Sequence, residues 1–309
     1  MPDDWFNIAL RFALYLDLMI LFGVSLFGTY ALRLHDRSSG IARQYATVIA
    51  TAAVFGMVLS LVSIVVMAKA MTGASEYSEL SSHVFGMLLT GTGVGIAWAV
   101  RMGALVACLA AVAMQRRRPD VRFASLAGAA AVALATVAWG GHGAMDDGSK
   151  GFLHLASDVL HLVAAGAWIG ALIAFVLLSF NRRVPLDHAV DTLSRTASGF
   201  ARIGTLIVVI LVVTGTINYL LIVGPTLQGL LTTLYGMLLL AKLSLFALML
   251  GLAAANRYLL SPRLESAVRA GNHAVAVGLL RRSLTMETSL AVVIVVLVAW
   301  LGVLSPGPT

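Results

Sequence analysis

The sequence predicts an all-α fold: a polytopic membrane bundle of eight transmembrane helices with both termini on the outer, non-cytoplasmic side. This prediction rests on composition, on the length of the apolar runs and on the placement of the basic residues. Of the 309 residues, 60% are hydrophobic and only 11% are charged, and the mean hydropathy is +0.94. A soluble domain carries about 25% charged residues. So few polar residues are typical of a chain whose solvent is lipid.

Apolar runs long enough to cross a bilayer occur eight times. A spanning helix needs about 20 predominantly apolar residues. The runs lie at roughly 5–32, 44–71, 85–114, 121–141, 151–180, 200–223, 232–260 and 283–304. They lack the alternation of a membrane β-barrel, and the connections between them are too short to hold a soluble domain. We therefore expect one membrane domain over residues 1–309, with three spans in 1–120 and five in 121–309.

Arginine placement predicts the orientation. Alternate connections hold sixteen arginines, whereas the opposite connections and the termini hold only Lys150. The arginines are Arg33, Arg37, Arg43, Arg116, Arg117, Arg118, Arg122, Arg182, Arg183, Arg195, Arg202, Arg257, Arg263, Arg269, Arg281 and Arg282. Because basic loops stay in the cytoplasm, both termini are expected outside. The net charge of +7 therefore reflects topology, and neither a nucleic-acid partner nor a nucleotide site is expected.

The fifth span carries the clearest candidate metal ligands. His154, Asp158 and His161 stand at i, i+4 and i+7, so they share one helix face. His161 lies about 10 Å deeper than His154. Imidazole and carboxylate are ordinary ligands of divalent copper, zinc or nickel, and they also relay protons. The stripe therefore predicts a metal or proton site that descends from the outer surface.

Further candidate ligands gather at the same surface. His142 ends the fourth span, His83 begins the third, and Met145 lies in the loop before His154. Thioether together with imidazole suits copper(I) better than zinc. The single cysteine, Cys108, lies in an apolar run and excludes an intrachain disulfide. A lone histidine at the membrane interface is also a common anchor, and this interpretation stays open for His83.

Ionisable residues inside other spans are candidates for charge balance or relay, because they are costly there. They are Asp17, Arg101, Lys242 and Glu287. Lys242 lies at a depth similar to that of Asp158, and Asp17 is a candidate partner for Arg101. A structural ion pair that locks the bundle is as good an interpretation of Asp17 and Arg101 as a relay.

The second half of the chain resembles the CopD family of bacterial copper-resistance membrane proteins. The resemblance runs from His142 through Asp158, His161 and Trp168 to Gly170, and it continues at later positions: Phe200, Gly215, Tyr235, Gly236, Lys242, Asn256, Arg257, Arg282 and Glu287. The first half matches in hydropathy and length. The resemblance implies a multi-pass bacterial inner-membrane protein with periplasmic termini. It also implies that the protein handles copper together with a periplasmic copper chaperone of the CopC type.

Three functions follow from these observations. The first is a copper-binding permease that moves copper from the periplasm across the membrane, with no enzymatic activity. The second is a redox protein that binds haem b or quinone and reduces copper, since histidines near the outer surface are able to face one another. The third is a non-transporting scaffold that docks periplasmic copper carriers, with the loop at 72–84 as its surface. Copper(I) and copper(II) both remain open.

Overall fold

All regular structure in the described residues is helical. The computed structural model describes residues 2–33, 36–113, 119–141, 148–181, 184–227, 229–270 and 274–304. The long helices are α1 (Pro2–Tyr30), α2 (Gly40–Thr72), α4 (Gly93–Ala113), α5 (Pro119–Ala135), α6 (Gly148–Ser179), α7 (Leu186–Ile222), α8 (Leu234–Ala255) and α10 (Ala274–Leu301). The shorter elements are η1 (Asp36–Ser38), η2 (Tyr77–Glu79), α3 (Ser82–Gly91), η4 (Thr136–Gly140), η6 (Asn256–Leu260) and α9 (Ser261–Arg269).

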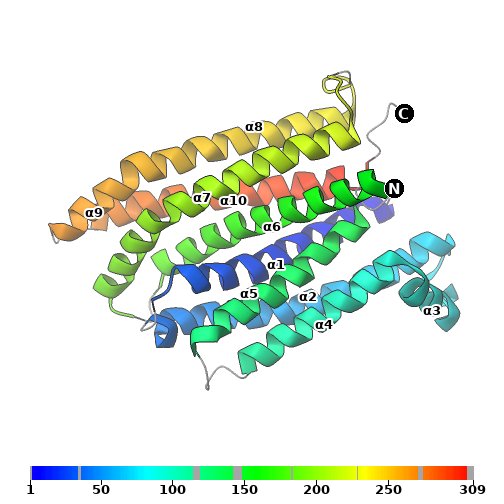
Figure 1. Ribbon diagram of the computed structural model, residues 1–309, viewed down its shortest axis with the longest axis horizontal. Helices are drawn as coiled ribbons and strands as arrows, with labels where there is room; N and C mark the ends of the chain where they lie inside the picture. Colours follow the sequence, from blue (N-terminus) through cyan, green and yellow to red (C-terminus); the bar gives the residue numbers. More distant parts are fainter. Residues whose placement is uncertain are drawn as a thin grey trace.

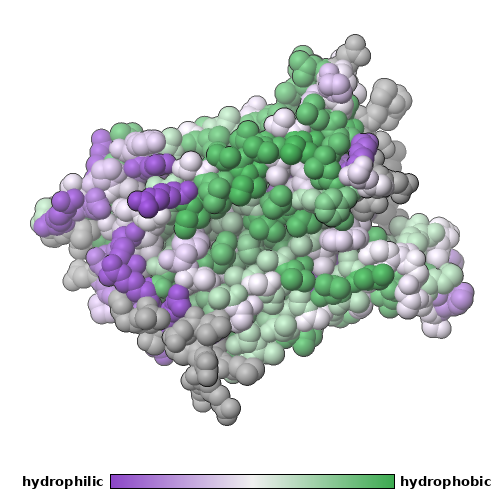
Figure 2. Space-filling model, viewed as in Figure 1, coloured by the Kyte–Doolittle hydropathy of each residue, from purple (hydrophilic) through white to green (hydrophobic). Residues whose placement is uncertain are grey.

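The prediction of eight spans is confirmed. Within the described residues, eight helical segments are long and apolar enough to cross a membrane. They run side by side as an elongated bundle, and α1 begins at the same end at which α10 finishes (Figure 1). A broad apolar surface follows the length of the helices, while polar side chains gather around the opposite end near α9 (Figure 2). The end that holds the start of α1 is called the outer end below, following the arginine-based prediction.

The third apolar run forms two helices instead of one. Thr92 adopts an extended conformation between α3 and α4. Its hydroxyl donates to the Leu88 carbonyl at 2.7 Å, and it accepts from the Gly95 amide at 3.0 Å. This side chain therefore closes one helix and caps the start of the next. Gly95 has no Cβ, which allows the backbone of α3 to fold back against α4.

Helices α1 and α6 cross in backbone contact at the centre of the bundle. A Cβ atom on Gly170 would lie 2.2 Å from Gly23 Cα, and one on Gly23 would lie 2.1 Å from the Gly166 carbonyl oxygen. Gly166 and Gly170 are four residues apart, the small-residue spacing that lets membrane helices approach closely. Helix α1 also packs against α2, α5 and α10, and α6 packs against α7 and α10. These two helices therefore form the frame on which the others assemble.

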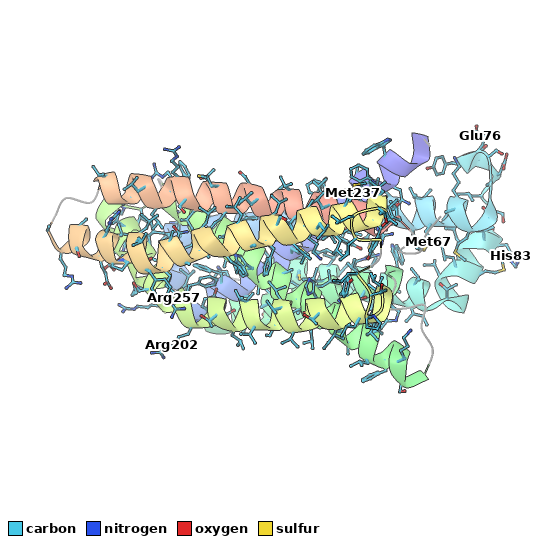
Figure 3. The ribbon with its side chains drawn as sticks, turned by 90° about the horizontal axis from the view of Figure 1, so that it is seen from above. Met67, Glu76, His83, Arg202, Met237 and Arg257 are labelled. Atoms are coloured by element: carbon cyan, nitrogen blue, oxygen red, sulfur yellow. The ribbon has the colours of Figure 1, made fainter. Side chains whose placement is uncertain are left out.

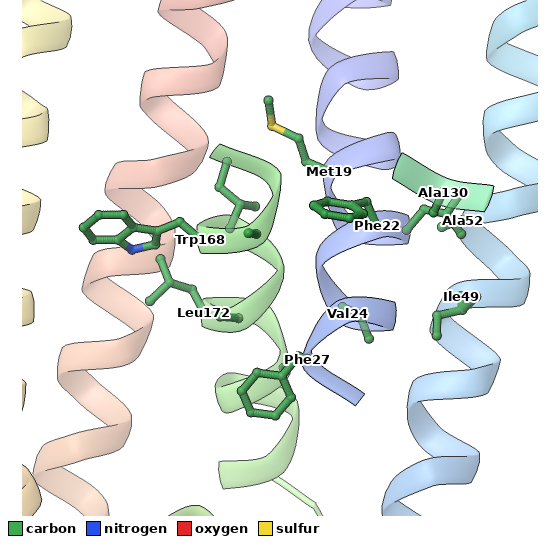
Figure 4. Close-up of a cluster of buried hydrophobic side chains, with 14 of the residues drawn as sticks. Met19, Phe22, Val24, Phe27, Ile49, Ala52, Ala130, Trp168 and Leu172 are labelled. Atoms are coloured by element: carbon green, nitrogen blue, oxygen red, sulfur yellow. The ribbon is translucent and has the colours of Figure 1, made fainter. Parts of the chain in front are cut away.

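Large side chains fill the bundle around this crossing. Phe22 and Phe27 of α1 are buried, as is Trp168 of α6 (Figure 4). The Phe27 ring packs edge to face on Phe175, with centroids 4.9 Å apart. Rings in this arrangement stabilise a core beyond the area that they bury. The core holds α6, and with it the predicted ligand stripe, in a fixed rotation.

At the end opposite the outer end, a buried carboxylate connects helices through an ion pair. Asp36 is fully buried and accepts from the Arg195 guanidinium at 2.9 Å, while His188 Nε2 lies 3.3 Å from its other oxygen. Arg202 and Arg257 also lie away from the outer end, which carries Glu76 and His83 (Figure 3). The ion pair fixes the connection between α1 and α2 to the first turns of α7.

Candidate functional site

A cavity of about 180 Å³ lies in the outer half of the bundle between α6, α7, α8, α10 and the start of α1. We call it the outer cavity. Its polar and ionisable lining includes Asp158, His161, Asn218, Tyr235 and Lys242. Three helices thus bring a carboxylate, an imidazole, an amide and an ammonium group into one space. Such convergence of ionisable groups inside a membrane bundle is typical of a functional site.

The His161 ring is held in one tautomer by Thr214 of α7. The Thr214 hydroxyl donates to the Ile210 carbonyl at 2.6 Å. Its only hydrogen is then in use, so the 2.8 Å contact with His161 requires that His161 Nδ1–H donates to Thr214 Oγ1. The other ring nitrogen, Nε2, keeps its lone pair and is available to a metal ion. This is the arrangement in which a neighbour orients a histidine ligand.

Asp158 is positioned from two sides. The Asn218 side-chain amide donates to Asp158 Oδ1 at 2.7 Å. Lys242 lines the same cavity and lies close enough for its charge to act on Asp158 and His161. This placement is compatible with the prediction that Lys242 and Asp158 lie at a similar depth in the membrane. The cavity thus brings the Asp158 carboxylate, the Lys242 ammonium and the Arg11 guanidinium into one space.

A second cavity, of about 260 Å³, lies in the other half of the bundle. We call it the inner cavity. Glu287 of α10 lines it and is 2% exposed, and its carboxylate accepts from the Asn256 side-chain amide. Asn256 begins the five-residue π-helical turn η6. Such turns occur often at functional sites, because they redirect side chains within a helix.

Apolar side chains separate the two cavities. On α8, Lys242 lines the outer cavity and Leu250 the inner one, with Phe246 midway. Phe246 packs against Trp168 of α6 with ring centroids 6.1 Å apart, and Leu211 of α7 is buried at the same level. We call Trp168, Phe246 and Leu211 the septum. The structure thus contains one cavity in each half of the bundle, with these apolar side chains between them and Trp168 lining the inner one.

Only part of the predicted ligand set lines the outer cavity. Asp158 and His161 do, whereas His154 is 1% exposed and does not. His83 is exposed on α3, which packs against α2 and α4. His142 and Met145 lie outside the described residues. Within the described ranges, no three His, Cys, Asp or Glu side chains cluster as a metal site.

The other predicted charges lie in two separate places. Glu287 belongs to the inner cavity, far along α10 from the outer end. Asp17 and Arg101 are both buried at 7% exposure, but they form no ion pair with each other in the described part of the chain. The hypothesis that Asp17 pairs directly with Arg101 therefore finds no support in the structure.

Thr214 is a site residue that the sequence pattern did not reveal. Threonine is ordinary in a membrane helix, where its hydroxyl donates to the preceding turn. Thr214 and Asn218 are four residues apart in α7, which is the spacing of His154 and Asp158 in α6. This equal spacing in α6 and α7 is the one feature of the sequence that points to Thr214, but it does not show that these two helix faces contact each other.

Comparison with known proteins agrees with these features. Residues 1–152 match the family model "Copper resistance protein D-like, N-terminal domain", and residues 194–301 match "Copper resistance protein D". Copper resistance protein D of Pseudomonas syringae pv. tomato is 48% identical over 304 residues, which cover 98% of each chain. The chain belongs to the copper resistance protein D family.

A second family relative is more distant. Inner membrane protein YebZ of Escherichia coli (strain K12) is 30% identical over 262 residues, covering 84% of this chain and 85% of that protein. No solved structure matches. The likeness to the copper resistance protein D family extends through the first half of the chain, beyond the second-half motif that carries the resemblance. The chain is accordingly a multi-pass membrane protein of a copper-resistance family.

The Thr214 contact gives a first test of the site. Thr214→Val removes the hydroxyl and keeps the side-chain volume, so the bundle should fold while Nδ1–H of His161 loses its acceptor. We expect copper affinity to fall about tenfold, the scale for a residue that orients a metal ligand. Isothermal titration of the purified protein measures the affinity. Thr214→Ser keeps the hydroxyl and should restore it, and equal affinities in all three proteins would contradict the assigned role.

Proposed function

We propose that this protein binds copper at its outer, periplasmic face and moves it across the bacterial inner membrane, without catalysing a reaction. Family membership supports the link to copper. The family resemblance also supports a periplasmic copper chaperone of the CopC type as the donor. Copper is therefore the cargo of the protein.

The observation that carries this proposal is the convergence of Asp158, His161 and Lys242 in the outer cavity. Nitrogen and oxygen donors of this kind bind divalent copper well. A copper ion and the Lys242 ammonium compete for the same Asp158 carboxylate. Entry of the cation therefore weakens the attraction between Asp158 and Lys242.

The two-cavity arrangement supports movement in steps. The septum of Trp168, Phe246 and Leu211 separates the outer cavity from the inner cavity with Glu287. An ion in the outer cavity meets an apolar layer, and crossing such a layer unhydrated is costly. We infer that passage requires rearrangement of α8 or α7 against α6, after which Glu287 and Asn256 receive the cation.

The proposal is tested by copper accumulation in cells and by copper binding to purified protein. His161→Ala removes the imidazole whose Nε2 is available to a metal ion. We expect copper binding to weaken by more than about a hundredfold, which is a larger effect than the loss of a residue that only orients a ligand. Copper accumulation that depends on the protein should be lost. His154→Ala, at a residue that does not line the outer cavity, should cause a smaller loss.

The matched control is His188→Ala. His188 lies at the opposite end of the bundle beside Asp36, so its loss removes an imidazole without touching either cavity. Copper binding and accumulation should stay near the level of the unchanged protein. If His161→Ala binds and accumulates copper as well as His188→Ala does, the outer cavity is not the copper site and the proposal fails.

A further inference from the structure

A third cavity, of about 330 Å³, lies in the N-terminal half of the chain. We call it the outer cleft. It opens between α1, α2, α4 and η4 toward the outer end. Its polar lining is Asn7, Arg11, Tyr15, Ser63, Trp98, Arg101 and Thr136. Neither Asp158 nor Lys242 lines it, and Arg101 does not line the outer cavity, but Arg11, Tyr15 and Val137 border both spaces.

The outer cleft has a strong excess of positive charge. Two arginines line it, and no carboxylate of the described residues does. Arg101 is only 7% exposed, and it forms no hydrogen bond or ion pair with any residue that the structure describes. A buried guanidinium without an acceptor is costly, and an unpaired charge inside a membrane bundle is more so. A bound anion next to the buried Arg101 guanidinium would therefore stabilise the protein.

Asp17 does not supply that anion. It lies on α1 against Gly56 of α2, and a Cβ atom on Gly56 would come within 2.6 Å of its Oδ2. Asp17 does not line the outer cleft, and within the described ranges it makes no ion pair with Arg101. Two buried opposite charges thus lie in one half of the bundle without direct contact. The open space next to Arg101 is where a partner fits.

The hydroxyl of Tyr15 adds a second donor. Arg11 Nη2 donates to the Tyr15 oxygen at 3.3 Å and to the Gly140 carbonyl at 3.1 Å. Tyr15 accepts in this contact, so its own hydrogen remains available. The hydroxyls of Ser63 and Thr136 already donate to the Ser60 and Ala133 carbonyls. Arg101 and Tyr15 therefore keep donors for an anion, and Asn7 and the Arg11 guanidinium lie on the same wall.

We propose that the outer cleft binds an anionic oxygen group, a carboxylate or a phosphate, between Arg101 and Tyr15. The guanidinium offers several parallel donors, which matches the planar or tetrahedral oxygens of these groups. A cavity of this size holds a small anion or a lipid headgroup. The anion comes either from solution on the outer side or from an anionic phospholipid of the outer leaflet. The site is distinguished from the proposed copper site by Arg101, which does not line the outer cavity.

The test is thermal unfolding of the full-length protein. In neutral detergent, the protein is titrated with inorganic phosphate and with acetate against sodium chloride of equal ionic strength. In nanodiscs, phosphatidylglycerol is compared with phosphatidylcholine. We expect the melting temperature to rise by about 5 °C at saturating anion. Arg101→Met should abolish the rise, and Tyr15→Phe should reduce it.

Arg202→Met is the matched control. Arg202 is exposed on α7, away from the outer end of the molecule (Figure 3), so this variant loses the same charge and should keep the full rise. A rise with phosphate or acetate identifies a soluble anion, and a rise only with phosphatidylglycerol identifies a lipid headgroup; both support the site.

Two results would overturn the proposal. One is the absence of any rise in the unchanged protein, and the other is an equal rise in Arg101→Met. Arg101→Met should melt no lower than the unchanged protein when no anion is present, because it removes an unpaired buried charge. A large fall in that temperature, together with no anion effect in the unchanged protein, would show a purely structural arginine.

Discussion

Gly170→Leu should abolish the folded protein. The Cβ of any side chain at this position would lie 2.2 Å from Gly23 Cα, and the obstacle is backbone that no rotamer change moves. The α1–α6 crossing must open, which separates the two helices that contact most of the bundle. We expect a loss of stability above about 4 kcal/mol, the range of severe steric disruption. Size-exclusion chromatography and thermal unfolding in detergent measure it.

Gly128→Leu is the matched control for this prediction. Gly128 lies in α5, and a Cβ atom there would meet nothing within 4 Å. The same change of side chain should therefore leave the melting temperature and the elution profile nearly unchanged. Gly170→Ala should already be unstable, since it introduces the clashing atom alone. If Gly170→Leu and Gly128→Leu unfold alike, α1 and α6 are not in backbone contact.

Lys242→Met should destabilise the bundle by about 3 kcal/mol, because it removes a positive charge from the cavity that the Asp158 carboxylate also lines. Asp158 would keep its hydrogen bond from Asn218 but lose the nearby ammonium group. The double variant Asp158→Asn with Lys242→Met carries neither charge and should recover part of the stability. A double-mutant cycle by chemical or thermal unfolding should give a coupling of at least about 1 kcal/mol.

Lys69→Met controls for the loss of a lysine in general. Lys69 lies near the outer end of α2, with its ammonium 4.6 Å from the centroid of the Tyr77 ring. Such a contact contributes about 0.5–1 kcal/mol, so the variant should lose far less stability than Lys242→Met. Additive effects of Asp158→Asn and Lys242→Met would show that the two charges act independently, and would remove Lys242 from the proposed charge balance.

The helix that carries the candidate ligands is identifiable from the sequence, because its signal lies within one helix. His154, Asp158 and His161 follow the helical period, and so do Tyr235, Lys242, Met249 and Asn256 of the seventh span. The structure shows that this second stripe faces inward: Tyr235 and Lys242 line the outer cavity, and Asn256 lines the inner one. Periodicity shows which residues share a face, but not what that face meets.

The sequence alone does not predict which side chains of different helices contact each other. The hydrogen bonds from His161 to Thr214 and from Asn256 to Glu287 join residues 53 and 31 positions apart. The break at Thr92 was hidden as well, because hydropathy does not change across it. Gly95 lies inside the predicted third span, and the structure shows that it accommodates the backbone of α3 where the chain folds back.

The sequence by itself determined the number of spans, the face of α6 that carries the candidate ligands, and the family resemblance. It did so because a bilayer demands about 20 apolar residues for each crossing and places basic residues on one side. Only the tertiary structure decided which helices are neighbours, how Asp158, His161 and Lys242 share one cavity, and that Arg101 and Asp17 stand apart. The physical reason is that an apolar side chain packs equally well against lipid and against another helix. Hydropathy therefore carries no information about which helices are neighbours.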